Sequence, residues 1–150
     1  MLRQYVTFKL NGEEYGVDIK DVQEITDFEG CTEIPDMPKF IKGIINIRGT
    51  ITPVIDLKER LKIIKANEKN DKKIIIINVE GKQIGFIIDS ASRVLTLNDE
   101  QIDPTPEIIS EVVENYIIGV GKLGEELMLI LDLKKMLTIK ELEEVLKIEE

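Results

Sequence analysis

Two segments of this chain occur twice, in the same order, and this internal repetition restricts the possible folds more than any single motif. Residues 10–25 align with residues 79–94, and residues 43–61 align with residues 119–137. The spacing between copies is much longer than the unit of a solenoid and fits one small lobe. We therefore predict two lobes of similar structure that meet along a seam.

The aligned copies agree at residues that shape the backbone. The matched pairs are Gly12 with Gly81, Gly16 with Gly85, Gly43 with Gly119, and Asp56 with Asp132. We expect one domain over residues 1–150, with lobes at about 1–66 and 67–137 and a C-terminal helix at 138–150. This division allows strands to be exchanged between the lobes. A chain of 150 residues can bury one substantial core, so two lobes sharing a core fit its length better than two independent domains.

Charge and composition exclude several classes of protein. The net charge of −9, with 29 acidic residues spread along the chain, argues against binding to nucleic acid, which requires clustered Lys and Arg. The basic segment 58–73 is interrupted by acidic residues, and we predict a solvated linker there. No apolar run approaches the roughly 20 residues that cross a bilayer, and the N-terminus lacks a signal-peptide pattern. We expect a cytoplasmic protein without direct membrane insertion.

Strand patterns dominate the chain. Asn11-Gly12, Arg48-Gly49 and Glu80-Gly81 each separate two apolar segments, as in β-hairpins whose turns need positive φ angles. The run Ile74–Ile77 predicts a strand covered on both faces, and Pro53 predicts an edge or a bulge. Nine or ten short strands favour two small barrels of about five strands each. Thr138 and Glu141 form a capping-box pattern that begins a short amphipathic helix.

Residues suited to catalysis are scarce. The chain has no histidine, and its single cysteine, Cys31, can form neither an intrachain disulfide nor a cysteine metal cluster. Asp56 and Asp132 occupy equivalent repeat positions and could act as a pair of catalytic carboxylates. Each follows a strand in a D-L-K turn, where an aspartate commonly caps the next helical turn, and we favour that structural role. No metal site or cofactor is expected.

Four segments in order resemble the CheW family of bacterial chemotaxis coupling proteins over nearly the whole chain. They are EYGVDIKDVQEI, IPDMPKFIKGIINIRGTITPVIDL, IGFIIDSASRVLTL and YIIGVGKLGEELMLILDL. The pattern N-x-R-G-x-x-x-P-V-x-D-L, from Asn46 to Leu57, is characteristic of CheW-like domains. The resemblance implies a mainly β fold, in which two five-stranded SH3-like barrels pack over a shared hydrophobic core, with a short C-terminal helix.

The resemblance also implies a non-enzymatic adaptor with two partners. CheW-like proteins join the cytoplasmic signalling tip of methyl-accepting chemoreceptors to the regulatory domain of the histidine kinase CheA, within arrays at the membrane. By matching positions, a receptor-binding groove would include Val22, Glu24, Ile25, Gly43, Arg48, Gly85 and Val94. Kinase-binding positions would be Lys42, Ile51, Asp103 and Ile108. Arg48 could either brace the lobe interface or contact a partner.

Three functional classes therefore compete. An adaptor should have an apolar groove between its lobes, whereas an enzyme should have a pocket holding Asp56 and Asp132. A nucleic-acid-binding double barrel should have a continuous positive groove, which the acidic composition disfavours. We favour the adaptor. Within the family, related domains are fused to a receiver or a kinase, and the length of 150 residues favours a free-standing CheW-type protein.

Overall fold

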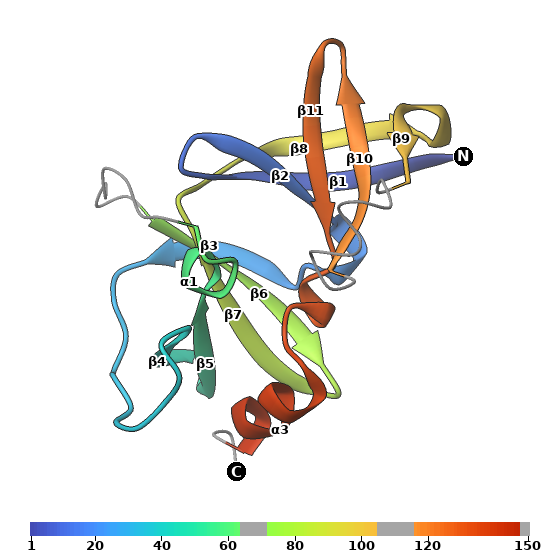
Figure 1. Cartoon of the computed structure of the whole chain (residues 1–150). Helices are drawn as coiled ribbons and strands as arrows, with labels where there is room; N and C mark the ends of the chain where they lie inside the picture. Colours follow the sequence, from blue (N-terminus) through green and yellow to red (C-terminus); the bar gives the residue numbers. More distant parts are fainter. Residues whose placement is uncertain (64–71, 105–115, 148–150) are drawn as a thin grey trace.

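The chain folds into two curved β-sheets that lie one above the other (Figure 1). A computed structural model describes residues 1–63, 72–104 and 116–147. The six-stranded sheet has the spatial order β8 (Ser90–Asn98), β1 (Leu2–Leu10), β2 (Glu13–Asp18), β11 (Glu126–Leu131), β10 (Ile117–Leu123), β9 (Ile102–Asp103). The five-stranded sheet has the order β3 (Glu24–Phe28), β6 (Lys72–Val79), β7 (Lys82–Ile88), β5 (Thr50–Asp56), β4 (Ile41–Ile47). The predicted mainly β fold of two small lobes is confirmed.

Each sheet takes strands from both halves of the chain. The N-terminal hairpin β1–β2 pairs with β8 and β11, whereas the hairpin β6–β7 pairs with β3 and β5. The junctions between β2 and β11 and between β5 and β7 are parallel, while the remaining strand pairs are antiparallel. The two halves of the chain therefore exchange hairpins, and a lobe of the folded protein is one sheet with the segments attached to it.

The predicted hairpin turns are present. Asn11 and Gly12 have φ angles of 50° and 83°, and Arg48-Gly49 and Glu80-Gly81 have closely similar pairs of values. Two consecutive positive φ angles are the signature of the type I′ turn, whose twist matches that of the flanking strands. Asparagine tolerates a positive φ better than arginine or glutamate does. The turns at Arg48-Gly49 and Glu80-Gly81 are therefore more strained than the turn at Asn11-Gly12.

Strand β6 shows how the core is organised. Ile74, Ile75, Ile76 and Ile77 are all fully buried, as the uninterrupted apolar run predicted. Ile75 and Ile77 face a cluster shared by both sheets, while Ile74 and Ile76 face the interior of the five-stranded sheet. In the spatial order of the sheet, β7 is the middle strand and β6 lies next to it, between β3 and β7.

Three apolar clusters make up the core of the described residues. The shared cluster joins Val6, Phe8 and Leu10 of β1 to residues of the five-stranded sheet such as Phe86. A smaller cluster lies inside the six-stranded sheet around Tyr5 and Met128, and another lies inside the five-stranded sheet. Each lobe thus has its own interior, and the shared cluster joins the two lobes.

The two aspartates matched by the repeat cap short helical turns. Asp56 Oδ1 accepts hydrogen bonds from the backbone N–H groups of Lys58 and Glu59, at the start of α1 (Leu57–Arg60). Asp132 Oδ1 accepts one from Lys134 N–H, at the start of a 3₁₀ turn over Leu133–Lys135. The two other 3₁₀ turns in the described residues cover Ile19–Asp21 and Asp99–Gln101.

The C-terminal helix α3 (Ile139–Lys147) begins at the predicted capping box. Thr138 Oγ1 accepts the Glu141 N–H at 3.1 Å, and Glu141 Oε1 accepts the Thr138 N–H at 2.8 Å. Val145 of this helix is fully buried in the shared cluster and anchors the helix there. Arg60 of α1 adds an ion pair to Glu141 at 3.4 Å, so α1 and α3 are tied together.

Some expectations from the sequence were wrong in detail. The described residues contain eleven strands rather than nine or ten, because β9 adds a two-residue strand to one sheet. Lys58, assigned to a solvated linker, lies in α1 and is buried. Pro53 lies in β5, which is an inner strand and not an edge, and it directly precedes the three residues of β5 that pair with β7.

Candidate partner-binding surface

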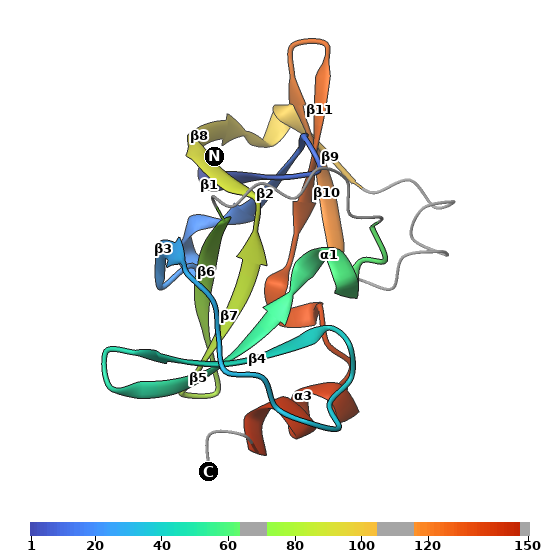
Figure 2. The same cartoon turned by 90° about the vertical axis from the view of Figure 1, so that its left-hand side faces the viewer.

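Two edge strands and one hairpin turn lie on the same side of the molecule, at the left of Figure 2. β3 is an edge of the five-stranded sheet, and β8 is an edge of the six-stranded sheet. The turn between β4 and β5, which carries Arg48, extends toward the same side. Edge strands present backbone groups and side chains that a second protein can reach. We call this region the seam surface, made of Val22, Glu24, Ile25, Arg48 and Val94.

Arg48 and Glu24 form an ion pair on the seam surface. The Arg48 Nη2 atom lies 3.5 Å from Glu24 Oε2. The side chain of Arg48 is 79% exposed and that of Glu24 only 20%, so the guanidinium lies over a largely covered carboxylate. The other carboxylate oxygen, Oε1, is buried without a hydrogen-bond partner. Arg48 therefore braces β3 and still exposes most of its donors.

Apolar side chains on the same surface are only partly covered. Val22 and Ile25 are half-buried and pack against the shared cluster, whereas Val94 of β8 is 50% exposed. On β1, the partner of Val94 is Val6, whose side chain belongs to the shared cluster. The apolar part of the seam surface thus continues outward from the core that joins the lobes.

Gly43 and Gly85, the other two predicted groove residues, are buried. A Cβ at Gly85 would lie 2.4 Å from Ile74 Cδ1, and a Cβ at Gly43 would lie 2.1 Å from the Thr32 carbonyl oxygen. Gly43 also has a φ of +155° beside the irregular pairing of β4 with β5. Both residues hold neighbouring chain segments close, and neither presents a side chain to a partner.

A second carboxylate–arginine pair, which the sequence did not indicate, involves β8. Arg93 Nη2 lies 3.8 Å from Glu14 Oε1, with the arginine 57% exposed and the glutamate 18% exposed. Arg93 is the repeat counterpart of Glu24, and the two positions carry opposite charges. Glu14 belongs to β2, two strands away in the sheet, so local patterns could not have paired it with Arg93.

The predicted kinase-binding positions fall on different strands. Lys42 on β4 and Ile51 on β5 are both exposed, Ile51 by 52%, on the same hairpin. Asp103 is exposed on β9 of the other sheet and forms an ion pair with Lys122 at 3.3 Å. Ile108 lies outside the described residues. Lys42 and Ile51 are thus brought onto one hairpin, whereas Asp103 belongs to the other lobe.

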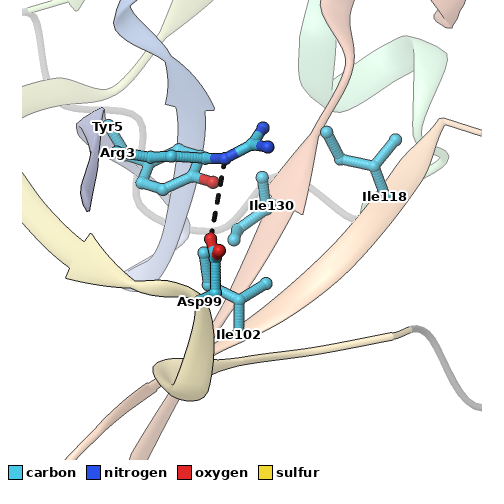
Figure 3. A pocket seen from close by; sticks show the side chains of 6 residues that line it. All are labelled: Arg3, Tyr5, Asp99, Ile102, Ile118 and Ile130. Carbon is cyan, nitrogen blue, oxygen red and sulfur yellow. Dashed lines mark ion pairs between the residues drawn. The ribbon is translucent and has the colours of Figure 1, made fainter. Parts of the chain in front are cut away.

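A pocket of about 270 Å³ lies beside strands of the six-stranded sheet, and none of its lining residues belongs to the seam surface (Figure 3). It is lined by Arg3, Tyr5, Asp99, Ile102, Ile118 and Ile130. Arg3 Nε and Asp99 Oδ1 are 3.8 Å apart, so its two charged side chains pair with each other. Burial raises the pKa of the Tyr5 phenol above its usual value.

The carboxylates that could have supported an enzyme are used in capping. Asp56 is buried and accepts two backbone N–H groups, and Asp132 accepts one, as the capping interpretation predicted. Neither lines the pocket described above. Burial also raises the pKa of the Cys31 thiol, so it is a weak nucleophile. Over the described ranges, no three cysteine or acidic side chains gather in a group that could hold a metal ion.

Residues 4–141 match the family model described as the CheW-like domain. The chain belongs to the CheW-like family. It is 36% identical over 140 residues to the chemotaxis protein CheW of Klebsiella aerogenes, covering 93% of this chain and 84% of that protein. It is also 36% identical over 146 residues to the chemotaxis protein CheW of Treponema pallidum, covering 95% and 86%.

A solved CheW structure has the same fold. The crystal structure of the scaffolding protein TtCheW from Thermoanaerobacter tengcongensis superimposes with a TM-score of 0.77 and 37% sequence identity. The match covers 88% of this chain and 90% of the other. The family resemblance seen in the sequence is therefore confirmed. Among the residues that the structure describes, helices are too short or too polar to cross a bilayer.

Proposed function

We propose that this chain is a non-enzymatic chemotaxis adaptor that couples the cytoplasmic tip of chemoreceptors to the histidine kinase CheA. Its relatives include proteins named for chemotaxis and one named as a scaffolding protein. The observation that carries the proposal is the seam surface, where an exposed arginine lies beside partly covered apolar residues of two edge strands. We expect the protein to be cytoplasmic and to reach the membrane arrays only through its partners.

The seam surface suits a helical partner such as a receptor hairpin. An amphipathic helix binds by placing an apolar stripe in a groove, and polar groups beside the stripe fix its register. Val22, Ile25 and Val94 would contact the stripe. Arg48, held by Glu24, would donate hydrogen bonds to carbonyl or carboxylate groups of the helix. Gly43 and Gly85 would contribute by keeping the backbone of this lobe in place.

The kinase would bind elsewhere on the molecule. Lys42 and Ile51 are both exposed on the β4–β5 hairpin, and we propose that this hairpin contacts the regulatory domain of CheA. Asp103 and Ile108 would form a second kinase contact on the other lobe. Two separate kinase surfaces allow adaptor and kinase to alternate in a ring.

Binding titrations test the proposal. We would titrate the wild type and Arg48→Ala against a receptor signalling-tip fragment and, separately, against the CheA regulatory domain. Arg48→Ala should weaken receptor binding by about tenfold or more, as expected for a central arginine in an interface, and leave kinase binding unchanged. Ile51→Ala should show the opposite selectivity.

Arg3→Ala is the matched control, because Arg3 is also an exposed arginine in an ion pair but lies in the pocket of the six-stranded sheet. It should bind the receptor fragment like the wild type. Absence of binding to either partner by the wild-type protein would refute the adaptor function. If Arg3→Ala lost as much receptor binding as Arg48→Ala, the proposed contact between Arg48 and the receptor would be refuted.

A further inference from the structure

A charged cluster lies where the chain passes from one sheet to the other. Asp89 is the single residue between β7 of the five-stranded sheet and β8 of the six-stranded sheet. It contacts Lys58 of α1, the helix that directly follows β5 of the five-stranded sheet. It also contacts Asn11 in the turn between β1 and β2 of the six-stranded sheet. The cluster therefore involves parts of both lobes.

Asp89 uses both carboxylate oxygens to connect these parts. Oδ1 lies 2.7 Å from Nζ of Lys58, and Oδ2 accepts the backbone N–H of Asn11 at 2.7 Å. Lys58 Nζ also donates to Asn11 Oδ1 at 3.2 Å, which closes a ring of three contacts. In addition, the Asp89 N–H donates to the Lys9 carbonyl oxygen at 3.1 Å. Lys58 and Asp89 thus fasten α1 of one lobe to the first hairpin of the other.

Burial makes this cluster unusual among the described ion pairs. The Lys58 side chain is 5% exposed and that of Asp89 is 27% exposed, and Lys58 is the single buried lysine in the described part of the chain. Moving a lysine out of water is unfavourable, so such a pair adds little net stability compared with an apolar replacement. Its better-supported use is to specify one geometry among several that are similar in energy.

The neighbouring core joins the lobes without directional contacts of this kind. The shared cluster joins the lobes through apolar contacts, and hydrophobic burial depends on area and has no preferred direction. Ion pairs and hydrogen bonds depend on distance and angle, so the Lys58–Asp89–Asn11 ring opposes a shift of one lobe against the other.

We propose that Lys58 and Asp89 are positioning residues that set the relative orientation of the two lobes. Through this orientation they determine the spacing between β3 and β8 at the seam surface, although neither residue belongs to that surface. The proposal goes beyond the proposed function, and it can be tested without any partner. The two proposals can therefore fail separately.

Distance measurements between the lobes provide the test. Spin labels would be attached at Lys42→Cys on β4 and Thr96→Cys on β8, two exposed strand positions in different sheets, in a Cys31→Ser background. Pulsed electron paramagnetic resonance should give one narrow distance distribution for this parent. Lys58→Met and Asp89→Asn should each broaden or shift the distribution, and Lys58→Arg should restore it because the charge returns.

A second variant and a control variant keep the test decisive. Asp89→Asn retains an acceptor for the Asn11 N–H, so it remains informative if Lys58→Met fails to fold. Lys73→Met is the matched control, because Lys73 pairs with Asp27 within the five-stranded sheet and at its surface, and it should leave the distribution unchanged. Parental distance distributions in both Lys58→Met and Asp89→Asn, with lowered thermal stability alone, would overturn the proposal. An equal change in Lys73→Met would overturn it as well.

Discussion

Gly85 shows how a single residue can be important without touching a partner. It pairs with Val54 of β5 and Ile76 of β6, at the parallel junction that the strand exchange creates. The side chain of Ile74 fills the space that a Cβ at this position would occupy. Gly16, its repeat counterpart, is filled in the same way by Met128 in the other sheet. The two copies of the repeat therefore share the same packing, in which a large apolar side chain lies against a glycine.

We predict that Gly85→Ala destabilises the fold by about 1–3 kcal/mol, because the new methyl group would overlap Ile74 Cδ1. Urea unfolding followed by circular dichroism measures the change. Ile74→Val removes the overlapping Cδ1 atom at a cost of about 0.5–1.5 kcal/mol, and the double variant should be less destabilised than the sum of the two single variants. Strict additivity would show that the two side chains do not compete for this space.

Residue types with strong local preferences were predictable from the sequence. Asn11-Gly12 gave the correct turn because its conformation depends on two residues only. Lys58 was assigned wrongly because its neighbours in the sequence are charged, whereas its burial depends on Asp89, 31 residues away in the chain (89 − 58 = 31). The pairing of Glu24 with Arg48 was also beyond local reasoning, since it requires β3 and the β4–β5 turn to meet.

At the scale of elements, the two D-L-K turns use the same aspartate N-cap at two levels of burial. Asp56 is buried and caps α1 by accepting two hydrogen bonds, whereas Asp132 is half-buried and accepts a capping hydrogen bond from Lys134 N–H. The local signal, an aspartate after a strand, was sufficient to predict both caps. It could not predict which one is enclosed by the fold.

We expect Asp56→Ala to cost about 2 kcal/mol of unfolding free energy and Asp132→Ala about 1 kcal/mol, because a buried helix end left without its acceptor is the more expensive defect. Thermal or urea denaturation of the two variants, each compared with its Asn replacement, measures the difference. The Asn variants should recover part of the loss, since asparagine is also a good cap. A larger effect at Asp132 would contradict the role of burial.

Strand existence was predictable, but strand partners were not. Alternating and continuous apolar runs marked β1, β2, β6 and β7 in the sequence. The parallel contacts of β2 with β11 and of β5 with β7 join segments far apart in the chain, and periodicity contains no information on such partners. The seam surface depends on those contacts, because they decide which strands remain at the edges. Its residues were therefore proposed from the family resemblance.

At the scale of the molecule, the shared cluster should make the two lobes unfold together. Ile75 of the five-stranded sheet and Phe8 of the six-stranded sheet are both fully buried in it. We predict one cooperative transition, in which Ile75→Val lowers the protection of the slowest-exchanging amides in both sheets by the same amount, about 1 kcal/mol. Native-state hydrogen exchange measures this. A loss of protection confined to the five-stranded sheet would show that the lobes unfold independently.

The exchange of hairpins has a consequence for how the protein could be divided. If the backbone were cut at residue 66, the first fragment would carry a β1–β2 hairpin whose neighbours β8 and β11 lie in the second fragment. The second fragment would in turn carry the β6–β7 hairpin needed by β3 and β5. Neither piece could complete a sheet alone, and each would supply what the other lacks. We therefore expect the two fragments to become ordered only when they associate, as the halves of a split-protein reporter do.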